Sequence, residues 1–439
     1  MSFDRLLALG PELVDELRLA GWEARHSLFV QYLLYGALLA ALVVAAAPAS
    51  PRARQWLVAA LSVASVALLG GPPLAAVVLG YSLALYAAVE YLPGAAGGIV
   101  AWTLIAALLL VPAFGPRDLL SGGDGRVLEF WAFATNVWWL RVIAYVMDRR
   151  VRGVARRPLR EFLVATLFFP TFLNGPIEST EQHAAHRVTG PAVRSWDELR
   201  ALGRELPLKL ARLAWGSVKV LLGVFYLGQD NAAVFATSGH IVGHPRLWLW
   251  VVELYVTFYV IFSGWSDVAI VLGWFCGSRV TENFDRPWRA RSVSDFWRRW
   301  HISFGDWLRT YVYIPLGGNR RRASLNVLLT FLFSGLWHVW GALKVLDIRL
   351  YPPRAWLGFV VWGLANGIAV MAGRWWDRSA ATRPVRDALR AGVPDWARTR
   401  AAQGLAFGFV ALAWIPFFLP PWVDVAACWE ILLRVAWLG

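Results

Sequence analysis

Long apolar runs recur along the whole 439-residue chain, and they constrain its fold more than any other feature. A helix needs about 20 residues to cross the hydrocarbon core of a bilayer. Runs near that length occur at roughly 27–47, 55–69, 72–91, 97–114, 128–147, 162–177, 208–228, 247–275, 324–342, 355–373, 403–420 and 422–438. The hydrophobic fraction of 58% and the charged fraction of 16% are also far from those of a soluble domain. The sequence therefore predicts an all-α, polytopic integral membrane helical bundle of about ten to twelve spans.

Gly and Pro interrupt several of these runs, and the interruptions indicate where the bundle departs from plain spans. Non-helical backbone is tolerated at membrane depth only where it is buried in protein or lines a cavity. We therefore expect re-entrant or interfacial helices within a single domain covering 1–439. Residues 1–25 mix acids and bases and lack the pattern of a signal peptide, which favours an amphipathic helix on the membrane surface.

Arginines gather in short segments between the apolar runs and give the chain a formal net charge of +14. The segments 148–161 and 374–400 are rich in arginine, whereas 115–127 and 229–245 are nearly neutral. The positive-inside rule predicts the first two on the cytoplasmic side and the other two on the outer face. Docking of anionic lipids or of a partner is the alternative explanation of the arginines. Nucleic acid is not an expected partner, because the arginines flank membrane segments.

The sequence offers little support for several common activities. Cys276 and Cys428 are too few for a disulfide framework or a structural zinc site, and we expect no metal centre. His183 and His186, spaced i, i+3, could hold an adventitious metal at most. The sequence has no Walker loop, dinucleotide fingerprint, G-x-S-x-G elbow or internal repeat, which weighs against ATP-driven transport, serine hydrolysis and secondary transport.

The pattern at 291–317 predicts one helix, with serine N-cap candidates at its start and proline and glycine at its end. Its aromatic residues fall at spacings of three and four and form one stripe: Trp297, Trp300, Phe304, Trp307 and Tyr311. Its polar residues occupy the remaining surface: Arg298, Arg299, Ser303, Asp306, Arg309 and Thr310. His301 lies at the edge of the aromatic stripe. We expect an interfacial or re-entrant helix whose arginines reach phosphates, or alternatively a plain anchor whose His301 only satisfies a backbone carbonyl.

A stripe of polar residues follows the otherwise apolar run at 324–342. Asn326, Thr330, Ser334 and His338 recur there every four residues, which places them on one slowly winding face of a helix. The stripe predicts either a hydrated channel leading to the imidazole or hydrogen bonds between packed helices. An ionisable residue inside a span is a functional-site hypothesis by default, and burial favours the neutral imidazole that a general base needs.

The segment FFPTFLNGPIE, which ends at Glu178, breaks another apolar run. Pro170 interrupts a helix, and the Gly175-Pro176 pair turns the chain. The turn is expected to bring Asn174 to the mouth of a substrate path, although a simple bend is the alternative. Direct chemistry by Glu178 is a weaker hypothesis.

These segments together resemble the membrane-bound O-acyltransferase family, and within it the bacterial branch that includes alginate O-acetylation proteins and the D-alanyl transferase of teichoic acid. The segment 262–319, FSGWSDVAIVLGWFCGSRVTENFDRPWRARSVSDFWRRWHISFGDWLRTYVYIPLGGN, resembles the family's central block almost residue for residue. FFPTFLNGPIE resembles its Phe-Pro-x-x-x-x-Gly-Pro-Ile element, and SGLWHVWG at 334–341 resembles the segment that carries its most characteristic histidine. VWGLANGI at 361–368 resembles the span that follows. The resemblance covers half of the chain and marks 262–341 as the expected catalytic block.

The resemblance implies a helical bundle with a funnel on each side of a thin central layer, and acyl transfer from a thioester to a hydroxyl. His338 is then the general base, while His301 positions a substrate or stabilises developing charge. The arginines of the central block are expected to receive the phosphates of the donor. The resulting candidate site has His338 and His301 as catalytic residues and Trp297, Arg298, Arg299, Trp300, Ser303, Trp307, Arg309, Asn326, Thr330, Ser334, Pro170, Asn174, Gly175 and Pro176 as substrate-binding residues.

By the same resemblance, the donor is acetyl-coenzyme A or an acyl carrier, which is a co-substrate and not a bound cofactor. The acceptor is an extracellular or cell-wall polysaccharide, reached from the bacterial cytoplasmic membrane with an extracytoplasmic transferase as partner. Membrane lipids are further partners. The alternatives are transfer of D-alanyl or another acyl group from a carrier-protein thioester to a wall polymer, lipid or natural product, and a channel-like member without catalysis.

The chain departs from the family pattern at three places. Val339 stands where the family usually has Gly after the second histidine, and 342–355 looks like an insertion. Both are expected to alter the acceptor pocket. Asn366 stands where relatives of the alginate branch often have a histidine, which removes a polar partner without touching either candidate histidine.

Overall fold

The computed structural model describes residues 11–46, 49–114, 125–186, 196–223, 244–345 and 357–418. The regular elements are, in chain order, α2 (Pro11–Ala45), α3 (Pro51–Gly70), α4 (Pro72–Tyr91), α5 (Gly94–Phe114), α7 (Gly125–Val146), η1 (Met147–Val151), α8 (Leu159–Leu167), α9 (Phe169–Phe172), α10 (Thr180–Ala185), α11 (Trp196–Leu222), α13 (His244–Phe275), η4 (Pro287–Arg289), α14 (Val293–Arg299), α15 (Ile302–Leu308), η5 (Arg309–Tyr313), α16 (Ala323–Val345), α17 (Leu357–Arg378), α18 (Arg383–Gly392), α19 (Asp395–Ala413) and α20 (Ile415–Phe418). All are helical over the described ranges, where the one β contact is an isolated bridge. The all-α prediction is therefore confirmed.

Among the described residues, seven helical segments are long and apolar enough to cross a membrane. They lie in α2, α3, α4, α13, α16, α17 and the run of α19 with α20. The chain is thus a multi-pass membrane protein, and its described residues hold seven candidate spans against the ten to twelve predicted for the whole sequence. The run at 162–177 is not a span, because the chain leaves helical geometry at Phe168 between α8 and α9. The run at 422–438 lies outside the described residues.

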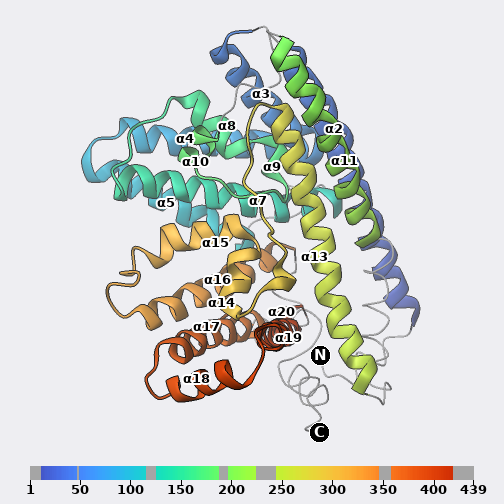
Figure 1. The fold of residues 1–439 in the computed structure, drawn as a ribbon. Coiled ribbons are helices and arrows are strands. Elements are labelled where there is room, and N and C mark those ends of the chain that lie inside the picture. Colours follow the sequence, from blue (N-terminus) through green and yellow to red (C-terminus); the bar gives the residue numbers. More distant parts are fainter. Residues whose placement is uncertain are drawn as a thin grey trace.

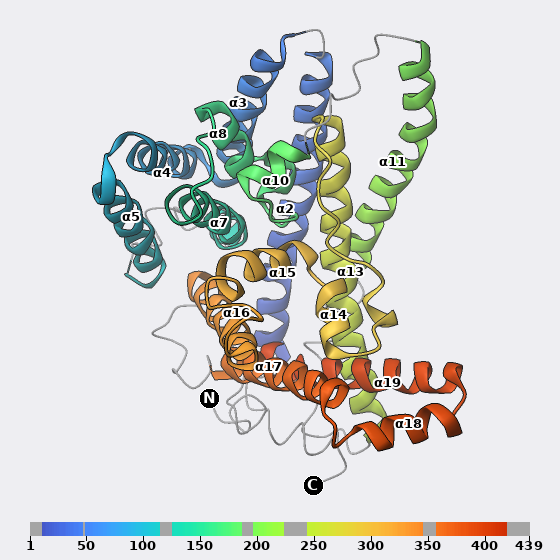
Figure 2. The same cartoon turned by 60° about the vertical axis from the view of Figure 1, so that its left-hand side comes forward.

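The helices form two groups that meet near the middle of the molecule (Figures 1 and 2). The long helices α2, α11 and α13 run together along one side, with α3 and the shorter α8 to α10 near one end. A large apolar cluster joins α2, α3, α4, α7, α8 and α13. The elements from α14 to α20 gather at the other end, where two further aromatic clusters lie. These aromatic clusters surround the region that holds both candidate histidines.

Two glycines let α16 and α17 pack against each other closely. A Cβ atom at Gly335 would lie 2.5 Å from the backbone oxygen of Phe359, and one at Gly363 would lie 2.5 Å from the backbone oxygen of Phe331. Such small-residue contacts allow backbones to approach in membrane bundles. The pair matters for function because α16 carries His338.

The N-terminal segment is not a separate surface helix over its described part. Residues 11–25 continue without a break into the first candidate span as α2, and residues 1–10 lie outside the described part of the chain. Most of the segments predicted on the outer face, 115–127 and 229–245, also lie outside it.

Arginines of the segment 148–161 are paired with the protein. The guanidinium of Arg149 donates to both carboxylate oxygens of Glu90, and Arg157 does the same to Glu181. Arg150 donates to backbone carbonyls at the end of α4. These contacts fix the bend between α7 and α8, so the arginines have a structural role in addition to any role in topology.

Candidate functional site

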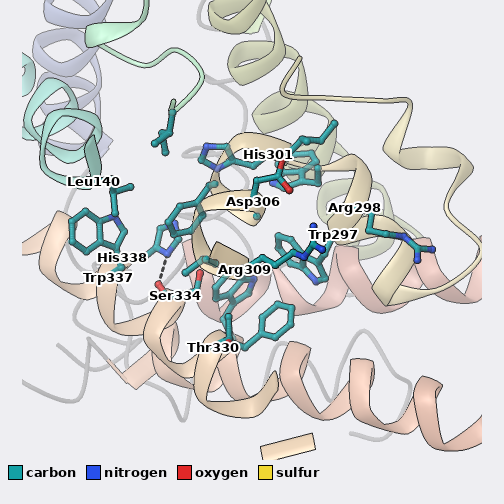
Figure 3. Close-up of a pocket in the computed structure, with 18 of the residues that line it drawn as sticks. Leu140, Trp297, Arg298, His301, Asp306, Arg309, Thr330, Ser334, Trp337 and His338 are labelled. Atoms are coloured by element: carbon teal, nitrogen blue, oxygen red, sulfur yellow. Dashed lines mark hydrogen bonds between the residues drawn. The ribbon is translucent and has the colours of Figure 1, made fainter. Parts of the chain in front are cut away.

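A cavity of about 840 Å³ lies between the two groups of helices, and both candidate histidines line it (Figure 3). Its walls come from α7, the bend after α9, α13, α14, α15, α16, α17, the turn after α19, and α20. Most lining residues are aromatic or aliphatic, with a few polar and basic groups among them. This size and lining are typical of small-molecule sites, which hold a few oriented polar groups in an apolar pocket.

His301 lies at a break between two short helices. The side chain of Ser292 caps α14 by accepting a hydrogen bond from the backbone N–H of Asp295 at 3.1 Å, as the N-cap pattern predicts. At Trp300 the backbone becomes extended and bridges to Phe284, and at His301 it turns left-handed, with φ 46° and ψ 53°. Non-glycine residues adopt this geometry rarely, and often at functional sites.

The prediction of one continuous helix over 291–317 is therefore wrong. The segment forms α14, a break, α15 and the π-helical turn η5. Pairing with the extended segment around Phe284 outweighs the local helical pattern. The N–H of Ile302 donates to the backbone oxygen of Asn283 at 3.0 Å, and that of Asp285 donates to the backbone oxygen of Arg299 at 2.9 Å. The predicted aromatic stripe is split by the break, with Trp300 and Phe304 in different clusters.

The imidazole of His301 is enclosed by aromatic rings. Its centroid lies 4.7 Å from the ring of Phe262 and 5.2 Å from that of Phe304. Burial, together with repulsion from the nearby His338, lowers the pKa of His301 to about 3. His301 is therefore a neutral imidazole at physiological pH, able to donate one hydrogen bond and accept another.

His338 is oriented by the helix that carries it. Its Nδ1 atom lies 2.7 Å from the backbone oxygen of Ser334. A carbonyl oxygen only accepts hydrogen bonds, so Nδ1 carries a proton, and in the neutral imidazole Nε2 then keeps its lone pair. Aromatic rings of Phe304, Trp362 and Phe417 hold the imidazole, with centroids 6.0, 5.5 and 4.9 Å away. The arrangement presents a neutral nitrogen base at the cavity wall.

Three arginines contribute to the cavity wall, namely Arg298, Arg309 and Arg374. The guanidinium of Arg374 donates to the hydroxyl of Tyr313 at 3.4 Å, and that hydroxyl donates to Asn319 at 2.7 Å. Guanidinium groups suit bidentate contacts with phosphate. The wall therefore offers cationic positions for an anionic part of a ligand.

Asp306 is the carboxylate that lines the cavity. Burial raises its pKa, and the charge of Arg309 offsets this only in part. Although Asp306 and Arg309 are one turn apart, no ion pair joins them in the described part of the chain. Arg309 is exposed, so its charge remains available to a ligand.

Of the other residues predicted to bind substrate, six also line the cavity: Trp297, Trp300, Thr330, Ser334, Asn174 and Gly175. Together with the two histidines, Arg298 and Arg309, they are brought to one cavity from segments more than a hundred residues apart. The stripe on α16 faces it over Thr330, Ser334 and His338.

The remaining predicted residues lie outside the cavity wall and hold the fold around it. The hydroxyl of Ser303 accepts from the N–H of Ile177 at 2.9 Å and donates to Asn283 at 2.7 Å. The indole of Trp307 donates to the backbone oxygen of Leu140 at 2.8 Å. These contacts join the central block to α7 and to the bend after α9.

Arg299 and Asn326 also make contacts within the protein. Arg299 pairs with Asp285 at 3.0 Å and with Asp295 at 3.1 Å, so its charge is already matched. The amide of Asn326 donates to the backbone oxygens of Gly318 and Arg321, which closes the turn before α16.

Arg141 on α7 anchors the bend at 168–178 and was missed by the sequence reasoning. Its buried guanidinium donates to the backbone oxygens of Thr166, Thr171 and Pro176 at 3.5, 3.3 and 3.0 Å. The backbone oxygen of Pro170 in turn accepts from the hydroxyl of Tyr32 at 2.5 Å. These bonds provide hydrogen-bond donors for backbone carbonyls around the break in the helix.

Glu178 is a buried structural carboxylate in this arrangement. It accepts hydrogen bonds from the N–H and hydroxyl of Thr281, at 2.9 and 2.7 Å, and lies 2.8 Å from Nδ1 of His186. Burial would raise its pKa, but hydrogen bonds from His183, His186 and Thr281 outweigh burial and hold the pKa well below its usual range. The histidines whose spacing suggested a metal thus contact Glu178.

The sequence reasoning also missed much of the aromatic enclosure. The cavity is also lined from α13, α17, the turn after α19, and α20 by Phe258, Phe262, Phe359, Trp414 and Phe417. Their local sequence patterns are those of ordinary apolar helices, so only the packing reveals them. Trp362 lies in the VWGLANGI segment, and the family resemblance of that segment could have indicated that α17 lines the site.

Comparison with known proteins places these features in a family. The model of the membrane-bound O-acyltransferase family matches residues 127–346, half of the chain, and includes both histidines. A probable alginate O-acetylase of Azotobacter vinelandii is 34% identical over 218 residues, covering 46% of this chain and 40% of that protein. A peptidoglycan O-acetyltransferase of Helicobacter pylori is 31% identical over 264 residues, covering 58% and 43%.

A third relative has a different acyl group in its name. A teichoic acid D-alanyltransferase of Bacillus subtilis is 27% identical over 199 residues, covering 41% of this chain and 47% of that protein. The chain thus spans less than half the length of these three relatives. The family match includes α14 to α16 and the bend at 168–178, which supply part of the cavity wall. The chain therefore belongs to the membrane-bound O-acyltransferase family.

Proposed function

We propose that this protein is an O-acyltransferase that moves an acetyl or other short acyl group from a thioester to a hydroxyl, with His338 as the general base. The observation that carries the proposal is the hydrogen bond from Nδ1 of His338 to the backbone oxygen of Ser334, which leaves Nε2 as a base at the cavity. Family membership supports the reaction class. The functions named for the relatives support the choice of small acyl groups.

The reaction begins when the acceptor hydroxyl donates a hydrogen bond to Nε2 of His338. As the acceptor oxygen attacks the thioester carbonyl, its proton moves to Nε2 and the new C–O bond forms. The tetrahedral intermediate collapses, the C–S bond breaks, and the leaving sulfur takes the proton back from Nε2. The base is thus neutral again, and the acyl group has changed from a thioester to an ester.

His301 acts beside the reacting carbonyl in this proposal. Phe304 packs against both imidazoles, with centroids 5.2 Å from His301 and 6.0 Å from His338, so the two rings share one wall of the cavity. A neutral imidazole donates a hydrogen bond without bringing a full charge, which suits stabilisation of the developing oxyanion. The aromatic enclosure excludes water that would otherwise hydrolyse the thioester.

The donor is an acyl thioester whose phosphates reach the basic part of the cavity. Arg298, Arg309 and Arg374 supply cations there. Arg298 also pairs with Asp295 at 3.2 Å but stays largely exposed, while Arg299 is paired with two aspartates. Coenzyme A and an acyl carrier protein both carry the thioester on a phosphopantetheine arm, so both bring a phosphate to the cavity. We infer that either is used as a co-substrate that leaves after each turnover.

The acceptor is an extracellular or cell-wall polysaccharide, and the protein resides in the cytoplasmic membrane of a bacterium. The alginate and peptidoglycan functions named for the relatives support a polysaccharide hydroxyl. An extracytoplasmic transferase that completes delivery to the polymer is the expected partner. D-alanyl transfer is the second candidate, supported by the teichoic acid relatives.

A donor assay with the purified protein in nanodiscs tests the proposal. We expect transfer of labelled acetyl from acetyl-coenzyme A to a soluble oligosaccharide, detected as an alkali-labile ester. Transfer from a D-alanyl carrier thioester, with none from acetyl-coenzyme A, would establish the second candidate. Absence of transfer and of thioester turnover with both donors would contradict the acyltransferase proposal and favour a channel-like member of the family.

A further inference from the structure

A short basic helix, α18, lies at the edge of the bundle, where the described protein leaves it uncovered. None of its ten residues is buried. Figures 1 and 2 show it at the periphery of the bundle, beside α17 and α19. Such an isolated helix needs a second environment to stabilise it, because ten residues are too few for a stable free helix.

The position of α18 in the chain identifies that environment. It follows α17 and precedes α19, and both of these contain candidate membrane spans. A segment that joins two consecutive spans lies where the chain leaves and re-enters the bilayer on one side. The sixteen residues 379–394 are therefore held at the boundary between lipid and water.

The two faces of α18 match this boundary. Val385 and Leu389 are one turn apart on one face, with 51% and 44% of their surfaces exposed. Arg383 and Arg390 lie on the other side of the helix, seven residues apart, and Arg386 lies between the two faces. An apolar face opposite an arginine face is the pattern of helices that lie in the plane of a membrane surface.

Tryptophans mark the same depth on the adjoining spans. Trp375 and Trp376 lie in the last turn of α17, and Trp396 lies in the first turn of α19. All three are exposed, and Trp396 keeps 72% of its surface uncovered. Tryptophan is enriched where spans cross the headgroup region, so α18 lies between aromatic residues placed at headgroup level.

The charges around α18 are not balanced within the protein. The segment 374–400 holds seven arginines and three aspartates. Asp387 is shared by Arg383 at 3.8 Å and Arg390 at 3.5 Å, and these two arginines remain 76% and 68% exposed. Exposed pairs of this kind contribute little, so both guanidinium groups are available to phosphates outside the chain.

Arg386 has a different role from its two neighbours. Its guanidinium donates to the backbone oxygens of Trp376 and Ser379 and to the hydroxyl of Thr382. It therefore fixes the turn between α17 and α18 and is unsuitable for a test of lipid binding. Arg383 and Arg390 make no such contacts with the turn.

We propose that α18 is an interfacial helix that binds the headgroups of anionic phospholipids, with Val385 and Leu389 in the acyl boundary and Arg383 and Arg390 on headgroup phosphates. Positive charge near an anionic membrane surface strengthens binding by about fivefold for each arginine. The binding is screened by salt. An acidic soluble protein is the competing occupant, and the experiment below separates it from lipid.

Hydrogen exchange of the full-length protein in nanodiscs tests this proposal. Amide exchange across 383–392 is compared in phosphatidylcholine and in a mixture with phosphatidylglycerol. We expect exchange about tenfold slower in the anionic nanodiscs at low salt, with the difference shrinking at high salt. The double variant R383Q/R390Q is expected to lose this difference, while exchange in α13 stays unchanged as a control for folding.

The matched control is R320Q/R321Q, which removes two exposed arginines from the turn before α16. It is expected to keep the lipid-dependent protection of α18. Equal exchange in both lipids, or a difference that survives in R383Q/R390Q, would overturn the proposal. Protection that appears only after a soluble acidic protein is added would assign the helix to that partner. Acyl transfer is not the readout, so the result is independent of the proposed reaction.

Discussion

Nδ1 of His338 and the backbone oxygen of Ser334 lie 2.7 Å apart, one turn from each other on α16. The hydrogen-bond acceptor is a backbone carbonyl of the helix, so the tautomer of the imidazole is set by the fold and not by a neighbouring side chain. Enzymes often use a carboxylate to orient a catalytic histidine. Here a carbonyl performs that orientation without adding negative charge to an apolar cavity.

The left-handed backbone at His301 predicts how two substitutions differ. Asn adopts this conformation more readily than Ala, which has no side-chain amide to bond locally. His301→Asn is therefore expected to keep near wild-type thermal stability, and His301→Ala to lose about 1–2 kcal/mol. Both variants should lose acyl transfer activity. Thermal unfolding in detergent compares them, and equal stability of the two variants would contradict the role of the backbone.

The pKa of His301 predicts a pH dependence of stability. Its pKa is about 3 in the folded protein and near 6.5 when unperturbed, so the unfolded chain binds more protons between these values. Stability from this residue is therefore present above pH 6.5 and is lost as the pH falls toward 3. Between pH 7 and 5, the Tm of the wild type should fall more steeply than that of His301→Asn. A steeper fall of the Tm in His301→Asn than in the wild type would contradict this prediction.

Arg374 is expected to act on donor binding and not on chemistry. Arg374→Gln removes a cation from the cavity wall, and a charge-assisted hydrogen bond is worth enough to raise KM for acetyl-coenzyme A about tenfold. The kcat should change by less than about twofold. Acetyl-pantetheine, which has no phosphate, should show no change in KM. Arg378→Gln is the control, since Arg378 lies one turn further along α17 and is exposed.

A loss of kcat in Arg374→Gln with both donors, at unchanged KM, would contradict this assignment. It would place Arg374 in the chemical step or in the packing of the site. The comparison therefore separates donor recognition from catalysis.

Gly335 is a position on α16 where an added methyl group is predicted to clash with α17. A Cβ atom there would lie 2.5 Å from the backbone oxygen of Phe359, which cannot move without shifting α17. Gly335→Ala should destabilise the protein by about 1–3 kcal/mol. Gly373→Ala is the control because nothing lies within 4 Å of its Cβ position. Unfolding of both variants in one detergent measures the difference, and equal effects would contradict the close packing.

Features encoded locally could be predicted from the sequence. Span-length apolar runs predicted the membrane helices because each depends on composition within its own segment. The stripe on α16 could also be predicted, since helical spacing alone places Thr330, Ser334 and His338 on one face. The serine cap of α14 follows from its neighbours in the same way.

Features set by distant contacts could not be predicted. The break at His301 depends on pairing of Trp300 with Phe284, which competes with a strong helical pattern. The positions of Ser303 and Trp307 depend on partners at Ile177 and Leu140. The spacing of residues within one segment cannot reveal these partners. Ser303 and Trp307 were therefore predicted to bind substrate, whereas they hold the cavity wall in place.

Acyl transfer by His338→Ala tests the central claim most directly. Single-turnover transfer from a labelled acyl thioester is measured in nanodiscs, with donor binding and thermal unfolding measured on the same samples. The expected result is a rate lower by about 10²–10⁴-fold at unchanged donor affinity and stability. Leu336→Ala, an exposed position on the same helix, should retain the wild-type rate. A folded His338→Ala protein that binds donor and transfers the acyl group at the wild-type rate would contradict the account.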